Sequence, residues 1–491
     1  MESKLKFYFE EKYNPVINEH AFNAQIKSVE YSSAPKPFKG LRLGCITFEN
    51  ELKGIDSKAI TLENSEKFER IELPHSIISL KADSFLTKIL VSDLYDAEGN
   101  LIIDGKLIRK KNTKKGKYLE GPKEITIPDG VTIIEDNIQW EEIYCYDVKK
   151  LILPPSLKYI GKNAFMSFGL TSIKLPKDLE IIESLAFSGC DIKTLTIPDN
   201  VRIIGDFAFQ HCYNLKKVKI GKNVESFGIG VFIGPNKIES IEGKYSSPDK
   251  NILVMDGILQ SVATKSIPIE FEIPSDIRKI ASFAFSRVKL DKLIIPESIE
   301  IIEENAFEKC EIKKFEGKFV ENRMVIVNDI LIKAEYNPSI DSEVLEIPEK
   351  VTKIGEGALS WTSYKVLLPS NLKIIGQSAF FSTDSYSNCK CQDILLPESL
   401  EVIDSAAFYN WESYQFKDGR FIIPKNVKYI GSNALSCTFY GGDIWFEPII
   451  PPVFEDKRIF WVTNIFVPSE SIEAYKEAIP ESADKIRVWE R

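Results

Sequence analysis

Short segments of alternating hydrophobic and polar residues recur along the chain, and LTSIKLP (170–176) shows their pattern. Ile173 and Leu175 are apolar, whereas Lys174 between them is charged, so one face of an extended strand is apolar. The proline that follows ends the strand because it lacks the N–H that a further ladder hydrogen bond requires. The pattern therefore predicts a short strand, buried on one face, in each copy.

A second pattern follows each proline, as in LEIIESLAF (179–187). The spacing of the apolar residues changes here, and we expect Leu179, Ile182, Ala186 and Phe187 to point inward. The small alanine leaves room for the phenylalanine of the next copy. Each copy is thus expected to supply one layer of a common core.

The spacing of the copies indicates how they are arranged. A proline marks nearly every copy, and Pro154, Pro176 and Pro198 follow one another at intervals of 22 residues. A period of about 20 to 29 residues is typical of leucine-rich repeats, in which each unit forms one coil of a solenoid. A single copy cannot bury its apolar face, whereas stacked copies cover one another and pair their strands about 4.8 Å apart.

Three segments interrupt this period, and each contains two apolar alternating runs around a turn. The central dipeptides are Asp-Gly or Asn-Asp, which favour two-residue hairpin turns. We therefore predict inserted β-hairpins at NLIIDGKLIRK (100–110), NILVMDGILQS (251–261) and MVIVNDILIKA (324–334). The basic run RKKNTKKGK (109–117) is interpreted as a solvated hairpin tip, with contact to an acidic partner as the alternative.

Composition and charge limit the classes of partner. At 491 residues the chain is too long for one ordinary core, unless a repeat array builds one elongated body from it. Its 44% of hydrophobic residues supply enough apolar surface for a core. A net charge of −9 and a pI near 5.3 give no electrostatic reason to expect nucleic acid or an anionic membrane as a partner.

The sequence contains no run of about 18 apolar residues, so we predict no transmembrane segment. The start, MESKLKFYFEEKYNP, mixes acidic residues into its apolar runs and cannot serve as the hydrophobic core of a secretory signal. Two localisations stay open. The protein is cytoplasmic if the chain is complete, and lies at the cell surface or is secreted if a leader was removed.

Few residues suggest chemistry. The three histidines, His20, His75 and His211, lie far apart and lack the spacing of a zinc site or a catalytic triad. We therefore expect no enzyme, no catalytic residue, no metal site and no cofactor.

Three of the eight cysteines occupy one position of the repeat, three residues after its phenylalanine. They are Cys190, Cys212 and Cys310. We interpret them as small apolar thiols buried between coils, with disulfide bonds as the alternative.

The unit LTSIKLPKDLEIIESLAFSGC resembles the repeat of the BspA-like leucine-rich repeat family, C-x-x-L-x-x-I-x-I-P-x-x-V-x-x-I-G-x-x-A-F-x-x-C. The likeness extends over about thirteen copies. YNPVINEHAFNAQIKSVEYS is similar to the opening segment of Bacteroides-type members, and IFVPSESIEAYKEA to their closing cap. The resemblance implies an N-terminal capping segment at 1–40, a solenoid at 41–448 and a C-terminal cap with a short helix at 449–491.

The expected fold is α/β but dominated by β structure. It is a right-handed leucine-rich-repeat solenoid with a parallel β-sheet on its concave face and inserted β-hairpins. The middle residue of each strand before a proline points out of the sheet, and stacking places these residues in a row, which we expect on the concave face. The row is mostly polar in the first ten copies.

In the last five copies the row is apolar, and consists of Leu367, Leu395, Ile422, Trp445 and Phe466. Apolar residues on both faces of successive strands imply that something covers the outward face. Longer insertions beside the row add aromatic residues, which often anchor contact sites. The candidate partner-binding residues are Leu367, Leu395, Ile422, Trp445, Phe466, Trp411, Tyr414 and Tyr386. Alternatively, the long loops and the C-terminal cap fold over the row and bury it.

These features favour a non-enzymatic interaction module that presents a rigid concave surface to a protein or glycan partner. The resemblance implies adhesion or ligand recognition, because members of the family are associated with bacterial surface attachment and with binding of host proteins. An intracellular structural scaffold without an extracellular ligand is the alternative.

Overall fold

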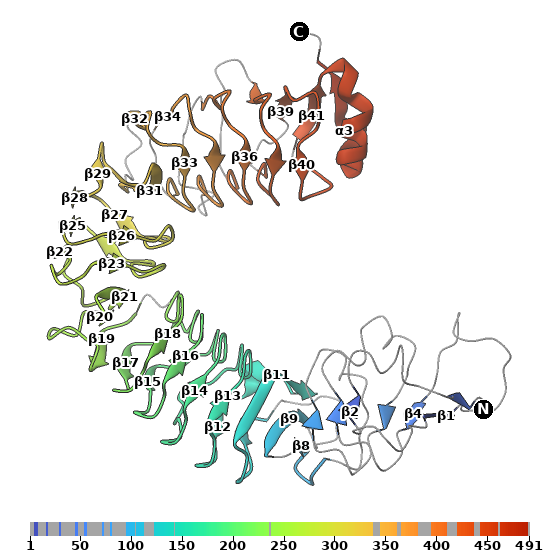
Figure 1. Cartoon of the computed structure of the whole chain (residues 1–491), viewed down its shortest axis with the longest axis vertical. Helices are drawn as coiled ribbons and strands as arrows, with labels where there is room; N and C mark the ends of the chain where they lie inside the picture. The colour runs from blue at the N-terminus through green and yellow to red at the C-terminus, as the bar shows by residue number, and fades with distance from the viewer. Residues whose placement is uncertain are drawn as a thin grey trace. The chain divides into compact units, whose positions relative to one another are not determined.

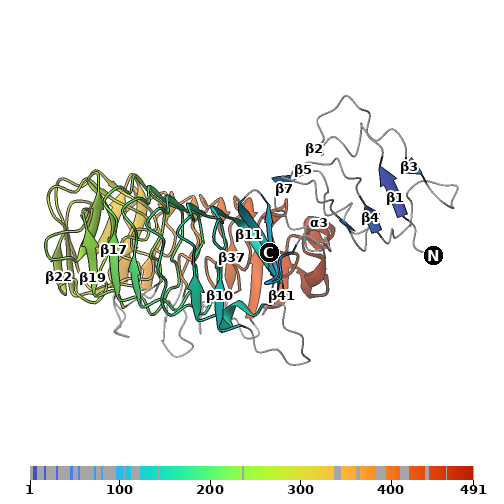
Figure 2. The same cartoon turned by 90° about the horizontal axis from the view of Figure 1, so that it is seen from below.

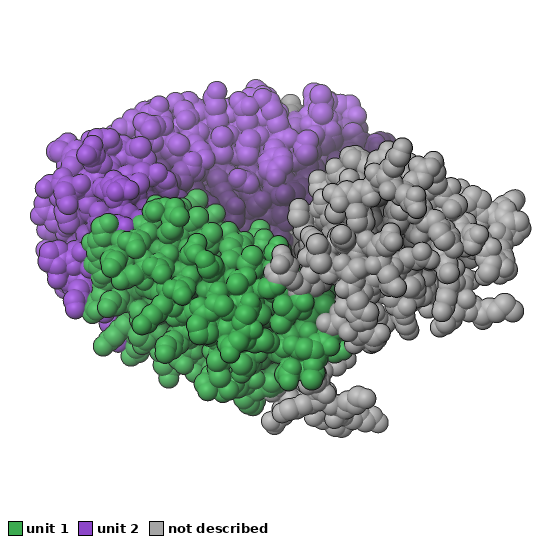
Figure 3. Space-filling view, turned by 60° about the horizontal axis from the view of Figure 1, so that its bottom comes forward, with its two compact units in different colours: residues 1–237, 242–244 green, residues 238–241, 245–491 purple. Residues whose placement is uncertain are grey.

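The computed structural model divides into two compact units. Unit 1 contains residues 1–237 and 242–244, and unit 2 contains residues 238–241 and 245–491 (Figure 3). The structure describes residues 95–103, 105–111, 122–141, 143–234, 237–336, 344–360, 365–381, 394–409, 420–436, 442–459 and 462–489, together with seven short strands within residues 1–94.

Most of the alternating segments before the prolines form a first set of parallel strands, which we call the outer strands. A strand was predicted in every copy, but residues 170–176 and 394–397 lie at the equivalent position without forming one. In β15 (Thr194–Thr196) the middle residue Leu195 is buried and both threonines are exposed, as the alternation predicts. Leu195 pairs in register with Val218 of the next coil. The outer strands are β10 (Glu124–Thr126), β12 (Lys150–Ile152), β15, β17 (Lys217–Ile220), β19 (Ser240–Gly243), β22 (Glu270–Glu272), β25 (Lys292–Ile295), β28 (Phe315–Gly317), β32 (Val344–Glu346), β34 (Lys365–Leu367), β37 (Phe421–Ile423), β39 (Gly442–Phe446), β41 (Val462–Val467) and β42 (Ile486–Val488).

The Ile-Ile segments after each proline form a second set of parallel strands, which we call the inner strands. Ile182 of one coil pairs directly with Ile204 of the next, 22 positions later. In unit 1 the inner strands are β11 (Ile133–Glu141), β13 (Tyr159–Ile160), β14 (Ile181–Ile182), β16 (Ile203–Ile204) and β18 (Ser226–Phe227). In unit 2 they are β23 (Lys279–Ile280), β26 (Ile301–Ile302), β33 (Lys353–Ile354), β35 (Ile374–Ile375), β36 (Val402–Ile403), β38 (Tyr429–Ile430) and β40 (Val453–Phe454). A further parallel pair joins β24 (Lys289–Leu290) to β27 (Glu311–Ile312).

The coils lie side by side within each unit, and each unit is a curved solenoid with parallel sheets (Figures 1 and 2). The inner strands lie on the inner side of each curve, so a parallel sheet does occupy the concave face. The outer strands lie on the opposite side (Figure 1). We expected the row of outward residues between the two apolar positions, such as Thr196 of β15, on the concave face, and this placement was wrong. The alternation of apolar and polar residues shows which side chains point out of a sheet, but it does not show which of the two sheets lies on the concave side.

A third line of backbone hydrogen bonds joins the coils at the Ala-Phe positions. The N–H of Phe187 donates to the carbonyl of Ala208 at 2.8 Å, and the N–H of Phe165 donates to that of Ala186. The residue before the alanine has a positive φ, for example 62° at Leu185. The chain thus turns sharply on a third side of every coil and still satisfies its backbone groups.

Phenylalanine rings stack through the core from coil to coil. The Phe187 ring centroid lies 5.3 Å from that of Phe165 and 5.4 Å from that of Phe209. Leu179, Ile182, Ala186 and Phe187 all have exposed fractions of 0%, as predicted. In unit 2, Phe380 and Phe408 repeat the arrangement at 5.0 Å. Each coil therefore completes the core of its neighbours.

The repeat cysteines are free thiols, as predicted, and are fully buried. Those of Cys190 and Cys212 donate to the carbonyl oxygens of Phe165 and Phe187 at 3.3 and 3.4 Å. Burial raises the pKa of Cys212 to about 12 and that of Cys310 to about 11. The thiols therefore stay protonated, and act as small core groups.

All three predicted hairpins are present. They pair β8 (Asn100–Ile103) with β9 (Lys106–Lys111), β20 (Ile252–Met255) with β21 (Ile258–Val262), and β30 (Met324–Val327) with β31 (Ile330–Ala334). Both turn residues have positive φ in two of them: 51° and 74° at Asp256 and Gly257, and 49° and 60° at Asn328 and Asp329. Positive φ at both positions defines the hairpin turn that matches the strand twist.

The second strand of each hairpin takes the place of an inner strand, because β9, β21 and β31 pair in parallel with β11, β23 and β33. A further segment covers the free edge of each hairpin. Tyr95 bridges to Leu101, Ser246 bridges to Leu253, and β29 (Val320–Glu321) pairs with β30. The covering segments protect strand edges that would otherwise offer unpaired backbone groups.

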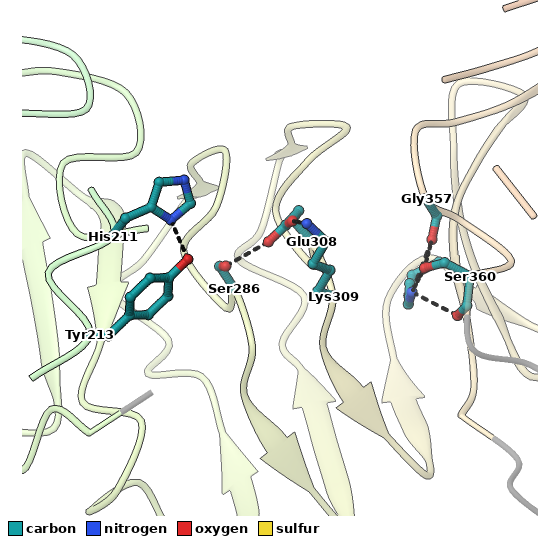
Figure 4. A network of polar contacts seen from close by, with 8 residues as sticks. His211, Tyr213, Ser286, Glu308, Lys309, Gly357 and Ser360 are labelled. Carbon is teal, nitrogen blue, oxygen red and sulfur yellow. Dashed lines mark hydrogen bonds and ion pairs between the residues drawn. The ribbon is translucent and has the colours of Figure 1, made fainter. Parts of the chain in front are cut away.

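The third hairpin buries a lysine that the sequence did not single out. Lys333 is 3% exposed, and its ammonium donates to the Gly357 carbonyl at 3.0 Å and the Ser360 hydroxyl at 3.1 Å (Figure 4). Burial lowers the pKa of Lys333. Arg109, 1% exposed, occupies the equivalent position of the first hairpin. Lys333 thereby connects the third hairpin to the neighbouring coil.

Within residues 1–94 the strands form two small sheets. One has the order β3 (Val29–Glu30), β1 (Lys4–Phe7), β4 (Cys45–Thr47), β6 (Ile71–Glu72) and the other β2 (Val16–Ile17), β5 (Gly54–Ile55), β7 (Ser79–Leu80). All pairs are parallel except β3 with β1.

Among the described residues, helical structure is confined to short segments, η2 (Cys145–Asp147) and, near the C-terminus, η3 (Ser469–Ser471), α3 (Ile472–Ala478) and η4 (Pro480–Lys485). Tyr475 on α3 is fully buried, and its hydroxyl donates to the Pro448 carbonyl at 2.9 Å. In the described part of the chain, no helix has the length and hydropathy needed to span a membrane.

Truncating one stacked ring should destabilise unit 1. Phe187→Ala removes a fully buried ring that packs against rings on both sides, so we expect a loss of about 3–5 kcal/mol in the free energy of unfolding. Met166→Ala, at a 45% exposed position of the preceding coil, should change it by less than about 0.5 kcal/mol. Urea unfolding followed by circular dichroism measures both. Equal midpoints for the two variants would contradict the stacked core.

The buried thiols should resist modification. At pH 8, a maleimide should leave Cys190, Cys212 and Cys310 unmodified in the native protein and modify all three in urea, as read by peptide mass spectrometry. Because their folded pKa values lie above the unfolded value of 9.0, the stability they contribute is complete below pH 9. It is lost as the pH rises through 11 to 12. Rapid native labelling would show that the coils do not close around them.

Candidate interaction surfaces

Clusters of chemically active side chains are scarce in this structure. Among the residues it describes, no three His, Cys, Asp or Glu side chains come together to hold a metal ion. His211 has its Nδ1 atom 2.9 Å from the Tyr213 hydroxyl (Figure 4). His20 and His75 lie outside the described residues.

The outward row of the outer strands is exposed in the C-terminal coils of unit 2. The exposed fractions are 44% for Leu367, 80% for Leu395 and 37% for Ile422. Glu346, the last residue of β32, pairs in register with Leu367, the last residue of β34, which fixes the position of the row on its strands. These three predicted residues therefore form an apolar strip on the outer side of unit 2, and we call them the outer apolar row.

The row continues into β39 and β41, but its exposure ends there. Ile422 pairs with Trp445, and Trp445 pairs with Phe466. The Trp445 and Phe466 rings stack with centroids 5.0 Å apart, and the Arg420 guanidinium lies 5.5 Å from the Trp445 centroid. Trp445 is only 9% exposed. It is thus a buried end of the row and not a projecting anchor, and Phe466 is half-buried.

Three other candidates, Tyr386, Trp411 and Tyr414, lie outside the described residues. Their positions relative to the outer apolar row are therefore not described. Their role in binding stays a prediction.

A second row, which the sequence reasoning missed, lies on the concave face. In each inner strand the first residue points out of the sheet and the second is buried, as in β14, where Ile181 is half-buried and Ile182 buried. The exception is β18, where Phe227 is half-buried. The outward residues are Ile133, Tyr159, Ile181, Ile203 and Ser226 in unit 1, and Lys279, Ile301, Lys353, Ile374, Val402, Tyr429 and Val453 in unit 2. The Ile-Ile doublet was the available signal, because adjacent strand residues face opposite sides.

Charged groups border this inner row in unit 1. The Tyr159 hydroxyl donates to Asp136 Oδ1 at 3.1 Å. Burial, followed by the charges of Asp136 and Glu183, raises the pKa of Tyr159 well above its usual range, so its hydroxyl stays protonated. Ion pairs also connect successive coils along the row, Lys158 with Glu180 at 3.2 Å and Arg202 with Glu225 at 2.9 Å.

The inner row of unit 2 ends beside carboxylates. Glu455 accepts hydrogen bonds from the Ser432 N–H at 2.6 Å and the Ser405 hydroxyl at 3.1 Å, and these contacts lower its pKa. Two further carboxylates accept from backbone N–H groups, Asp404 from Ser405 and Asp456 from Asn433. This end of the inner face is therefore anionic at neutral pH.

A repeated parallel coil with a buried phenylalanine stack defines a leucine-rich repeat protein. The model of one family, the BspA type leucine rich repeat region, matches residues 13–95, 141–248, 264–324 and 331–441 in six copies. These ranges cover more than two thirds of the 491 residues, and the chain belongs to this family. The resemblance seen in the repeat is thereby confirmed.

Solved structures of bacterial leucine-rich repeat proteins are also similar to the chain. One from Bacteroides ovatus ATCC 8483 shares 20% identity over 99% of this chain and 98% of its own, with a TM-score of 0.30. One from Eubacterium ventriosum ATCC 27560 shares 20% over 64% and 82%, with a TM-score of 0.38. A leucine rich cell surface protein from Faecalibacterium prausnitzii A2-165 shares 17% over 82% and 79%, with a TM-score of 0.27. No curated protein matches the chain.

Two substitutions distinguish the exposed and the buried parts of the outward row. Leu395→Asp, at an 80% exposed position, should change the free energy of unfolding by less than about 0.5 kcal/mol. Trp445→Asp places a charge between Phe466 and Arg420 and removes a buried ring, so we expect a loss of more than about 3 kcal/mol. Urea unfolding of unit 2 measures both. A large loss with Leu395→Asp would mean that other segments cover the row.

Proposed function

We propose that the protein is a non-enzymatic interaction module and that the outer apolar row binds a protein partner. The observation that carries the proposal is the exposure of Leu367, Leu395 and Ile422 on three successive coils. Single exposed aliphatic residues are ordinary, but a contiguous strip of them on a soluble surface usually marks a contact site.

The geometry of the row suits a protein surface. The inner strands of the three coils, β35, β36 and β38, pair in parallel, so the three side chains belong to coils that follow one another directly. Aliphatic groups offer no hydrogen bonds, so their affinity comes from removing apolar area from water, at about 25 cal/mol per Å². An apolar strip or helix face of a partner meets that requirement.

The buried end of the row adds rigidity. Trp445 and Phe466 are stacked, with interplanar angle 7°, and hold the coil next to Ile422 in a fixed position. A preordered surface loses less conformational entropy on binding than a mobile one. Adhesion through a protein receptor is the use that membership of the family favours. The proposed contact lies on the outer side of unit 2, whereas the sequence suggested the concave face.

Capture of partners by variant proteins tests the proposal. The triple variant Leu367→Asp, Leu395→Asp, Ile422→Asp should lose a protein partner that the unchanged chain retains, because burial of three charges opposes docking. The matched control carries Thr126→Asp, Ile152→Asp and Thr196→Asp at equivalent strand positions of unit 1 and adds the same charge. Affinity capture from host and bacterial extracts, quantified by mass spectrometry, compares the three proteins.

The expected result is a partner retained by the unchanged chain and the control and reduced at least tenfold with the triple variant. Circular dichroism should show that all three proteins are folded. Equal capture by the triple variant and the control would remove the outer apolar row as the binding site.

A further inference from the structure

Exposed lysines gather on the outer side of unit 1, on β15, β17 and the coil before β15 (Figure 1). Three successive coils contribute residues 170–176, 192–198 and 215–221, which contain five lysines but no acidic, aromatic or arginine residue. The five exposed lysines are Lys174, Lys193, Lys216, Lys217 and Lys219. Since the chain as a whole has a net charge of −9, this face is opposite in sign to the whole protein.

Hydrogen bonds between coils place these lysines in register. Thr196 of β15 pairs with Lys219 of β17. The Lys193 N–H donates to the Thr171 carbonyl at 3.3 Å, so the preceding coil continues the same register, and its Lys174 lies beside Thr196. Lys174 and Lys219 are therefore two coil steps apart, about 10 Å, with Thr196 between them.

Four of the five ammonium groups have no ion-pair or hydrogen-bond partner among the residues that the structure describes. They belong to Lys174, Lys193, Lys217 and Lys219, which we call the lysine patch. The carboxylate of Asp199, in the turn after β15, is paired with Lys222 at 3.3 Å. The lysine patch is therefore a group of positive charges that no ion pair of the described chain neutralises.

The outer strands of unit 2 show how such lysines stabilise the solenoid when carboxylates lie beside them. Lys292 of β25 lies 3.5 Å from Glu270 of β22, and Lys313, just before β28, lies 2.6 Å from Asp291 of the preceding coil. These lysines connect successive coils through ion pairs. Because the lysine patch makes no such pairs, the stacking of coils does not explain it, and its charges are available to a ligand.

Carboxylates limit the patch along the solenoid. On one side Glu124 of β10 pairs with Lys150 of β12 at 2.7 Å. On the other side the sheet continues with β19, which contains Glu242. The patch thus covers three coils, with a backbone footprint of about 10 by 10 Å. A stable protein interface buries about 800 Å² on each partner, so the patch suits a narrow chain better than a protein surface.

We propose that the lysine patch binds an anionic polysaccharide, whose carboxylate or sulfate groups are carried on hydroxyl-rich sugar units. Oxygens of these acidic groups accept charge-assisted hydrogen bonds from ammonium groups. Exposed hydroxyl groups of Ser172, Thr194 and Thr196 lie on the same strand faces. They can donate to and accept from the hydroxyls of the sugar.

The spacing of the charges fits a polymer that carries an acidic group on alternate sugar units. The two coil steps from Lys174 to Lys219 span about 10 Å, which is comparable to the length of one disaccharide. A neutral sugar unit between two acidic ones then lies over Thr196, whose side chain is exposed. The sequence of ammonium, hydroxyl and ammonium groups along the row thus matches the sequence of groups along the ligand.

Other anionic partners match the patch less well. Single-stranded nucleic acids are bound through aromatic side chains on which the bases stack, and the three segments contain none. A bilayer or a nucleic-acid duplex presents a broad anionic surface, which would also meet the carboxylates of Glu124 and Glu242 on either side. A single chain of sugars can follow the patch without approaching these carboxylates.

Calorimetric titration of the full chain with defined hexasaccharides tests the proposal. The probes are a heparin hexasaccharide, which carries sulfates and carboxylates, hexagalacturonate, which carries carboxylates alone, and neutral maltohexaose. In about 20 mM NaCl, we expect at least one anionic probe to bind with a dissociation constant below about 100 μM, and maltohexaose to show no binding at about 5 mM. Binding of the heparin probe alone would identify sulfate as the required group. About 300 mM NaCl should weaken the binding at least fivefold.

Variants of equal charge separate the patch from the net charge of the protein. Lys174→Gln, Lys217→Gln and Lys219→Gln together should weaken binding at least tenfold, whereas arginine at the same three positions should retain it. The matched control, Lys292→Gln, Lys313→Gln and Lys314→Gln, removes the same charge from the outer strands of unit 2 and should bind within twofold of the unchanged chain. All substituted side chains lie at the surface, and circular dichroism should show that each variant is folded.

Three results would overturn the proposal. They are the absence of binding by both anionic hexasaccharides, equal binding by the patch variant and its control, and binding that does not weaken with salt. After the first result, titration with phosphatidylserine vesicles and with oligothymidylate would show whether the patch serves an anionic membrane or a nucleic acid instead. The outer apolar row of unit 2 is tested with separate variants, so failure of one proposal leaves the other standing.

Discussion

Backbone hydrogen bonds between successive coils determine the positions of all other groups in the two units. They run along three sides of each coil, through the outer strands, the inner strands and the Ala-Phe turns, where the Phe187 N–H donates to the Ala208 carbonyl at 2.8 Å. An isolated coil would leave these backbone N–H and carbonyl groups without partners and its phenylalanine ring exposed to water. Register and core packing are therefore properties of neighbouring coils, as expected for a repeat array whose units contact only their neighbours.

Fixed register turns each position of the repeat into a row on the surface. A single substitution changes one point of a row, whereas a run of similar substitutions produces a stripe of apolar, charged or aromatic groups about 4.8 Å apart. The outer apolar row of unit 2 and the inner row both arise in this way, on different sides of the coil. Binding specificity in such a protein depends on which side of which coils carries the stripe, and needs no pocket.

The alternation before each proline, the hairpin dipeptides and the repeat cysteines were sufficient to predict most of the outer strands, the three insertions and the buried thiols, because each depends on local chemistry. The outward direction of Leu367, Leu395 and Ile422 also followed from alternation, whereas the sequence left open whether other segments cover them. The burial of Trp445 did not, since Arg420 and Phe466 come from other coils. Nor did the buried Lys333, whose partners Gly357 and Ser360 lie 24 and 27 positions further along the chain. Which of the two sheets lies on the inner side of the curve depends on how both sheets pack together. Neither the alternation before the prolines nor the Ile-Ile doublet could predict it alone.

Distances between spin labels measure coil stacking most directly. Nitroxides attached through genetically encoded keto amino acids at positions 126 and 196, and then at 126 and 219, lie on the outward row of unit 1. Their backbones should be three and four coil steps apart, about 14 and 19 Å, although 70 and 93 residues separate them in the sequence. The account predicts two narrow distributions, with the second longer by about 5 Å. Broad distributions, or a second distance longer by tens of ångströms, would contradict the stacking of successive coils.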